Sequence, residues 1–364
     1  MGFGLTKLFS KLHTEDLSTP KQVVGIDLGS SSVKVVEIQQ QEDVLILKTY
    51  GELQLGPYAQ TDLGKATKLS TEQQTEALVD VLRESKVTAK SGVMTLQLST
   101  SFVTVFSIAA SEKEDIGPRV RVEARKYIPI PLSDVTLDWS ELPPIGENDS
   151  PVREVLVAAV QNEARAETFS LLQALQMSSQ PTEIELFSTL RAVSKTDDKS
   201  IAIIDLGAQT SKLYIAHEGI VRKIHRVFAG GSQVTQRIAD QLQIKFEDAE
   251  NQKRNYTQEV SHAQEIKRAV TITFERPLQE FKRVIDQYQI RTGIDVSRII
   301  ISGGSSAFVD MKGYIEYLFN KPVEKANPFE KIAYPAFMED TLKEIAPTFT
   351  VALGAALRPF EIFE

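Results

Sequence analysis

Cysteine is absent from this chain of 364 residues, which excludes disulfides, thiolate zinc sites and a cysteine nucleophile. Histidine is scarce, and the four histidines do not share the spacing of metal ligands. No apolar run approaches the roughly 18–20 residues that span a bilayer. The motifs Gly-x-Gly-x-x-Gly, Gly-x4-Gly-Lys-[Ser/Thr] and Gly-x-Ser-x-Gly are also missing. Dinucleotide-dependent hydride transfer, P-loop chemistry and serine hydrolysis are therefore disfavoured.

The overall composition is that of a folded protein, with 42% hydrophobic and 25% charged residues. Acidic residues outnumber basic ones, 49 against 41, which gives a net charge of −8. This balance disfavours sequence-independent binding to nucleic acid. The length predicts two or three domains of about 100–200 residues each.

One short pattern occurs twice. Residues 23–36 read VVGIDLGSSSVKVV and residues 201–214 read IAIIDLGAQTSKLY, and five of the 14 positions are identical. Each copy is an apolar run that predicts a buried strand, then Asp-Leu-Gly, then small polar residues. A lysine follows seven positions after each aspartate. Hydroxyls and free amides after such a glycine are good phosphate donors, so two facing copies would hold a polyphosphate and its Mg²⁺.

Two further glycine corners follow apolar strands. Ala229-Gly230-Gly231-Ser232 and Ser302-Gly303-Gly304-Ser305 both precede a predicted helix. Backbone amides at such a corner could accept phosphate, or the flat glycine surface could receive a base. Four corners of this kind favour a nucleotide site over ordinary tight turns.

The remaining pattern alternates strands and helices, with a domain boundary predicted in the charged loop 195–200. Helices are predicted at 71–86, 117–127, 163–177, 232–243, 246–253, 257–275, 277–292, 307–319 and 344–358. Pro277 is expected to kink or separate the two helices that flank it. Residues 1–12 resemble a short amphipathic helix that could lie on a membrane or a partner, the simpler alternative being a frayed or docked terminus.

The order of the glycine loops resembles that of the actin-like ATPase superfamily. Four segments narrow the resemblance to the PilM family of type IV pilus assembly proteins, which is related to FtsA. These segments are GIDLGSSSVKVVE at 25–37, EARKYIPIP at 123–131, EVLVAA at 154–159 and AExxK at 249–253.

The resemblance implies an α/β, two-lobed actin-like ATPase fold with an inserted α+β subdomain in lobe one. The implied parts are a tail at 1–19, a lobe-one core at 20–98, 181–198 and 345–364, the insertion at 99–180, a lobe-two core at 199–240 and 295–344, and a helical subdomain at 241–294.

The resemblance also implies ATP and Mg²⁺ as cofactors and assigns residues to them. Asp27 and Asp205 would hold Mg²⁺ through water. The phosphates would lie between one loop with Gly29, Ser30, Ser31, Ser32 and Lys34 and another with Gly207, Ala208, Gln209 and Thr210. Gly230 and Gly231 would lie close to the nucleotide. Glu250 and Lys253 would form hydrogen bonds with the ribose, and the adenine would lie against Gly303, Gly304 and Ser305.

The second loop departs from the Asp-x-Gly-Gly-Gly-Thr pattern of active relatives, in which an acid follows. Gln209 and Thr210 are weak candidates for positioning a water, and no general base stands nearby. Weak or absent ATPase activity is therefore expected. Whether Lys212 contacts phosphate or is a solvated strand residue stays open.

The implied function is a cytoplasmic ATP-binding scaffold at the inner face of the bacterial inner membrane. Its partner would be a PilN-like membrane protein, whose cytosolic N-terminal peptide docks in a groove between the first lobe and its insertion. Membrane contact would be indirect, and no nucleic acid is expected. The alternatives are an FtsA-like division or filament protein and, less favoured, a small-molecule kinase on the same fold.

Overall fold

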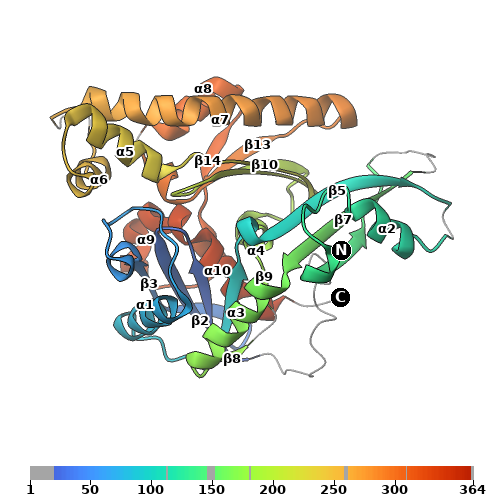
Figure 1. Cartoon of the computed structure of the whole chain (residues 1–364), viewed down its shortest axis with the longest axis horizontal. Coiled ribbons are helices and arrows are strands. Elements are labelled where there is room, and N and C mark those ends of the chain that lie inside the picture. Colours follow the sequence, from blue (N-terminus) through green and yellow to red (C-terminus); the bar gives the residue numbers. More distant parts are fainter. Residues whose placement is uncertain are drawn as a thin grey trace.

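The computed structural model describes residues 20–111, 114–145, 152–179, 182–257, 261–308 and 310–361. The predicted tail at 1–19, with its amphipathic stretch, lies outside these residues. Within them, the structure contains two large sheets, and a smaller third sheet projects to one side (Figure 1).

The first sheet has the strand order β3-β2-β1-β4-β8, and β9 also pairs with β4. Its strands are β1 Gln22–Leu28, β2 Ser32–Gln41, β3 Val44–Gln54, β4 Ser91–Leu96, β8 Ser178–Ser179 and β9 Glu183–Ile184. Strands β1, β2 and β3 are antiparallel, whereas β4 is parallel to β1. Side chains such as Val24 and Val35 pack against α1 (Thr71–Glu84) and α3 (Asn162–Ala174), while Val36 and Ile38 face the opposite side.

The second sheet repeats this arrangement, with the order β12-β11-β10-β13-β14. Its strands are β10 Ser200–Leu206, β11 Ser211–His217, β12 Ile220–Val227, β13 Arg298–Ser302 and β14 Val323–Lys325. One face is covered by α5 (Gly231–Leu242), α7 (Ala263–Thr292) and α8 (Met311–Phe319), and α6 (Phe246–Arg254) packs against α5. The sequence repeat therefore corresponds to two equivalent sheets.

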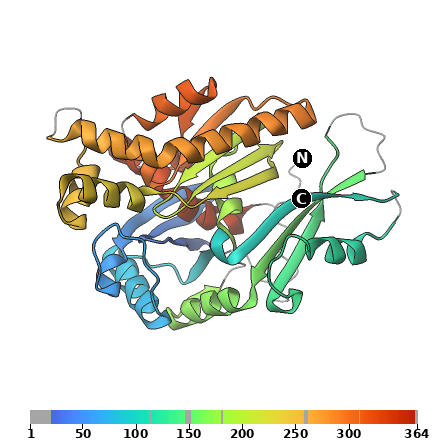
Figure 2. The same ribbon diagram turned by 45° about the horizontal axis from the view of Figure 1, so that its top comes forward.

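The third sheet contains β5 (Ser101–Ala109), β7 (Val152–Gln161) and β6 (Val135–Glu141) in that order, with α2 (Gly117–Ala124) on one face. Figure 2 shows this unit beside the two large sheets rather than stacked on them. Its other face contributes Leu156 and Val160 to the core that the second sheet shares with α4 (Glu185–Val193).

Two short helices cross beneath the cleft. Helix α4 packs closely on α10 (Thr350–Leu357), because a Cβ on Gly354 would lie only 1.9 Å from the Ser188 carbonyl oxygen. Buried Glu183 next to this crossing pairs with Arg191 and Arg358. Helix α9 (Glu339–Ile345) precedes α10.

Of the two predicted effects of Pro277, a kink or a separation of the flanking helices, the separation is wrong. Helix α7 runs without interruption through Pro277. The proline is buried on the same apolar stripe as Phe274, Leu278 and Phe281, and this packing against the second sheet holds the helix together. Tertiary burial therefore outweighs the loss of one backbone hydrogen bond.

Candidate functional site

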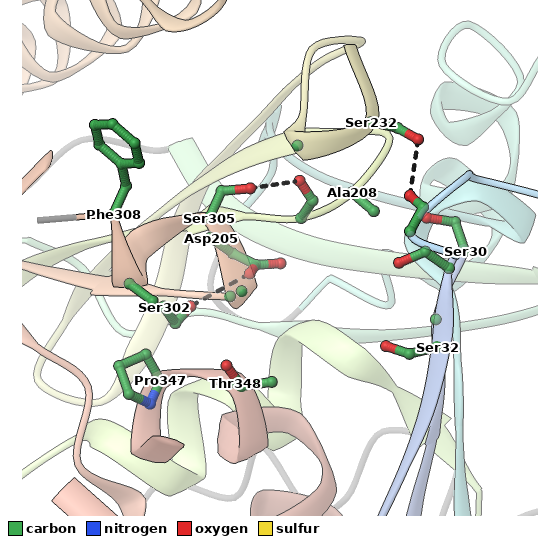
Figure 3. Close-up of a pocket in the computed structure, with 18 of the residues that line it drawn as sticks. Ser30, Ser32, Asp205, Ala208, Ser232, Ser302, Ser305, Phe308, Pro347 and Thr348 are labelled. Carbon is green, nitrogen blue, oxygen red and sulfur yellow. Dashed lines mark hydrogen bonds between the residues drawn. The ribbon is translucent and has the colours of Figure 1, made fainter. Parts of the chain in front are cut away.

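A cavity of about 340 Å³ lies between the two large sheets. All but two of the residues predicted from sequence line it: Asp27, Gly29, Ser30, Ser31, Ser32, Lys34, Asp205, Gly207, Ala208, Thr210, Gly231, Glu250, Lys253, Gly303, Gly304 and Ser305. Figure 3 shows Ser30 and Ser32 on one side of the pocket and Asp205, Ser302 and Phe308 on the other. Residues about 180 positions apart in the chain are thus brought to one site.

The two hairpins have the same geometry. Asp27 pairs with Lys34 across β1 and β2, and Asp205 pairs with Lys212 across β10 and β11. In the first turn the Gly29 N–H donates to a carbonyl three residues on at 3.0 Å, and the equivalent bond in the second turn is also 3.0 Å. Both turns are therefore closed by the same backbone hydrogen bond beside the cavity.

The hydroxyls on these turns are available to a ligand. The side chains of Ser30, Ser31 and Thr210 make no hydrogen bond with any other residue that the structure describes. Lys34 also reaches the cavity, where its Nζ donates to Ser32 Oγ at 2.7 Å. Such donors suit phosphate oxygens.

Gln209 and Gly230 are the two predicted residues that do not line the cavity. Gln209 is exposed at the tip of the second turn. Gly230 lies behind this turn, where a Cβ would come within 2.5 Å of the Ala208 carbonyl oxygen. The adjacent Ser232 N–H donates to the same carbonyl at 2.8 Å. Gly230 thus lets α5 begin directly against the turn.

Lys212 is buried, so the alternative of a solvated strand residue is wrong. Its Nζ lies 3.1 Å from Asp205 Oδ2 and 2.7 Å from Glu185 Oε2. Burial by itself would lower the pKa of Lys212, but Glu185 and Asp205 raise it well above its usual value. Lys212 is therefore a charged residue held between two carboxylates.

Glu185 was missed by the sequence reasoning. It begins α4, is buried, and also accepts a hydrogen bond from the Leu98 N–H at 2.7 Å. The available signal was an acid inside the apolar run at 183–193. A buried acid requires a partner. The apolar run could therefore have indicated that Glu185 has a buried partner, but it could not have shown that this partner is Lys212.

Asp27 faces the cavity without a partner among the residues that the structure describes. Burial raises its pKa from 3.8 to about 6. The nearby charges of Glu185 and Asp205 add to this shift, whereas Lys34 and Lys212 oppose it. Asp27 is the carboxylate in this cavity that is open to a cation.

The aspartates differ in how well they fit Mg²⁺. No cluster of three or more candidate ligands occurs in the described part of the chain, so the protein alone builds no closed metal site. Asp27 suits a hydrated Mg²⁺ that is also held by phosphates. Asp205 fits poorly, because Lys212 already occupies one of its oxygens.

Glu250 and Lys253 form a polar wall on α6. Lys253 Nζ contacts Glu250 Oε2 at 2.6 Å, and Arg254 Nε donates to Glu250 Oε1 at 2.7 Å. Thr235 Oγ1 donates to the same carboxylate at 2.5 Å. Burial would raise the pKa of Glu250, but Lys253, Thr235 and Arg254 together hold it below its usual value. A ligand hydroxyl here would meet an already ordered charged pair.

An apolar wall at the other end of the cavity was also missed. The rings of Tyr256 and Phe308 stack at 4.5 Å between centroids, and Phe274 and Pro347 also line the cavity. Gly303 and Gly304 form its flat edge, with Gly303 at φ +82°. A flat aromatic ligand would fit between the glycines and these rings.

The two large sheets have equivalent strand orders and lie on either side of the polar cavity. This arrangement is the actin-like ATPase fold. A family model described as type IV pilus assembly protein PilM matches residues 25–360. The chain therefore belongs to the PilM family of type IV pilus assembly proteins.

Solved structures agree with this fold. The chain is 22% identical to one titled PilM-PilN type IV pilus biogenesis complex, with a TM-score of 0.79 over 95% of this chain and 100% of that chain. The ethanolamine utilization protein EutJ from Carboxydothermus hydrogenoformans is 14% identical, with a TM-score of 0.55 over 96% and 93%. MreB 5 of Spiroplasma citri bound to AMPPNP is 12% identical, with a TM-score of 0.50 over 95% and 97%.

Among the described residues, no helix has the length and apolar character needed to cross a membrane.

Proposed function

We propose that this chain binds ATP between its two large sheets and acts as a nucleotide-binding scaffold in type IV pilus assembly, at the cytoplasmic face of the inner membrane. The observation that carries the proposal is the convergence of two equivalent hairpin turns, with unpartnered hydroxyls, on one cavity. The PilM family supports the pilus role. The AMPPNP bound to MreB 5 supports the class of ligand.

ATP would lie along the cavity with its phosphates between the two turns. Ser30, Ser31 and Lys34 would contact the phosphates from one side and Thr210 from the other. Mg²⁺, when bound, would neutralise part of the phosphate charge, and Asp27 would hold it through water. The adenine would lie at the apolar end against Gly304, and Glu250 and Lys253 would face the ribose.

We propose binding rather than rapid hydrolysis because the second turn, from Gly207 to Thr210, carries no acid that could order the attacking water. Glu185 has both oxygens engaged, by Lys212 and by the Leu98 N–H. Asp27, which has no partner among the described residues, is the carboxylate that we assign to hydrated Mg²⁺. A base must reach the attacking water and accept its proton. Gln209, a candidate for positioning that water, is exposed and does not line the cavity.

The two sheets with their helices would be the two lobes of the predicted arrangement. The lobe-one core would comprise 20–98, 181–198 and 345–364, and the lobe-two core 199–240 and 295–344. The third sheet would be the insertion at 99–180, and α6 and α7 would form the helical subdomain at 241–294.

The partner would be a PilN-like membrane protein that docks through its cytosolic N-terminal peptide. A similar solved structure is titled as a PilM-PilN complex, which supports this choice. The sequence predicts a groove between the first lobe and its insertion, whereas we place the peptide in a second hollow of about 230 Å³, where the third sheet meets β12 of the second sheet. Its walls include Phe102, Tyr127, Ile128 and Ile224, which suit an apolar peptide.

Gly304 provides the test of the ATP site. A Cβ on Gly304 would meet no atom within 4 Å, so a phenylalanine there would extend into the adenine end rather than into the protein. Gly304→Phe should abolish ATP binding in calorimetry. Gly313→Phe is the matched control, since Gly313 is exposed on α8 and equally open. Unchanged ATP affinity in Gly304→Phe, or an equal loss in both variants, would contradict the proposal.

A further inference from the structure

We infer that Lys212 is a resident cation that takes the place of a divalent metal ion at Asp205, so that ATP binding here depends only weakly on Mg²⁺. This inference rests on the proposed function, because it concerns how the same cavity accepts ATP. It differs from the expectation for the sequence repeat, in which both aspartates serve Mg²⁺.

Both oxygens of Asp205 are enclosed by protein. Oδ2 accepts a hydrogen bond from Lys212 Nζ at 3.1 Å. Oδ1 receives a longer one from Ser302 Oγ at 3.4 Å. Gly303 lies beside the same oxygen, since a Cβ on Gly303 would come within 2.5 Å of it. A metal ion that bound Oδ2 directly would have to displace Lys212.

Lys212 is held firmly in that position. On its other side Nζ contacts Glu185 Oε2 at 2.7 Å, and the second oxygen of Glu185 is fixed by the Leu98 N–H. Both Lys212 and Glu185 are buried. Moving the lysine away would leave two buried carboxylates without a counter-charge, which is strongly unfavourable. The ion pair is therefore expected to persist when ATP enters.

The first hairpin provides an internal comparison. Lys34 occupies the same register as Lys212, yet its Nζ donates to Ser32 Oγ and lies 3.8 Å from Glu52. Its cross-strand partner Asp27 has no contact of this kind in the described chain. Identical spacing has thus produced an open aspartate on one side and a neutralised one on the other.

The consequence concerns charge. A polyphosphate must enter a cavity that is lined by the carboxylates of Asp27, Glu52, Glu185, Asp205 and Glu250. Lys212 offsets one of the two charges of Glu185 and Asp205, and basic side chains also accompany Glu250 and Glu52. Asp27 is therefore the lining carboxylate that has no salt bridge among the described residues. Replacing Lys212 with a neutral residue would free Asp205 and Glu185 to repel the phosphates or to bind a divalent ion.

Calorimetric titration of ATP in excess Mg²⁺ and in EDTA tests this inference. For the unmodified chain, we expect the two dissociation constants to differ by less than about tenfold. For Lys212→Met, affinity in EDTA should fall by more than about tenfold, and Mg²⁺ should restore most of it. Lys212→Arg keeps the charge and should behave like the unmodified chain.

Two results would overturn the inference: loss of ATP binding by the unmodified chain in EDTA, or an unchanged Mg²⁺ ratio in Lys212→Met. The first needs no variant, so the test survives if Lys212→Met does not fold, which circular dichroism would reveal. If the unmodified chain binds no ATP even with Mg²⁺, the proposed function itself fails. Binding that requires Mg²⁺ refutes the inference alone.

Discussion

The hydroxyl of Ser232 in the first turn of α5 donates to the Gly64 carbonyl oxygen at 3.0 Å. The same hydroxyl accepts a hydrogen bond from the Ala66 N–H at 2.9 Å. Gly64 and Ala66 belong to the loop between β3 and α1, and the neighbouring Thr67 N–H donates to the Ser30 carbonyl oxygen at 2.9 Å. This loop therefore connects the first hairpin turn to α5, the helix that follows β12.

Ser232→Ala should loosen this connection. Loss of hydrogen bonds worth about 1 kcal/mol predicts roughly three- to tenfold weaker ATP binding and faster proteolysis within residues 56–70. Ser99→Ala is the control, because Ser99 bonds only to Gln97 at an exposed site. Equal ATP affinity and equal cleavage rates in both variants would show that the connection does not close the cavity.

Gly354→Ala should destabilise the fold. Its Cβ would fall 1.9 Å from the Ser188 carbonyl oxygen, and backbone at this crossing of α4 and α10 has no room to yield. Overpacking predicts a loss of about 1–3 kcal/mol in the free energy of unfolding. Gly313→Ala, also within a helix but in open space, should instead stabilise by about 0.5–1 kcal/mol. Chemical denaturation measures both, and equal effects would contradict the account of this crossing.

Asp27 predicts a pH-dependent stability. Because its pKa is raised from 3.8 to about 6, the folded chain binds more protons than the unfolded chain between these values, and stability falls as pH rises through this window. Asp27→Asn should match the unmodified chain below about pH 4 and exceed it by on the order of 2 kcal/mol above pH 6. Denaturation across this pH range tests the shift, and a constant difference between the two proteins would refute it.

Tyr127 should contribute to peptide binding. It is partly exposed at the second hollow and stacks on Phe106 at 5.3 Å. Aromatic anchors of this kind often account for 2 kcal/mol or more of binding, so Tyr127→Ala should weaken binding of a PilN-like N-terminal peptide by more than about tenfold. Fluorescence anisotropy of a labelled peptide measures the change. Tyr317→Ala, an exposed tyrosine on α8, serves as the control, and equal affinities would place the peptide elsewhere.

The repeated pattern predicted more of the site than any other feature. Local spacing fixed the register of Asp27 with Lys34 and of Asp205 with Lys212, because a short turn between paired strands leaves no alternative. The cavity that joins the two turns then followed from the resemblance to actin-like ATPases. Equivalent spacing was not enough to predict that Lys212 would pair with Asp205 while Lys34 would turn to Ser32.

The remaining site features depend on contacts between distant segments. Glu185 contacts Lys212 because α4 packs against the second sheet. A local sequence pattern cannot predict this packing. Tyr256 and Phe308 stack across 52 positions (308 minus 256) from separate elements. The error at Pro277 has the same origin, since its burial in the second core is a tertiary property.

Hydrogen exchange followed by mass spectrometry, with and without ATP, tests the central claim that one nucleotide lies between the two hairpin turns. We predict that ATP slows exchange at 28–34, at 206–212 and at 303–308 together, because these segments line the same cavity. The exposed helix surface around Gly313 should not change. Protection confined to one of the three segments, or no protection in any of them with ATP in large excess, would contradict the account.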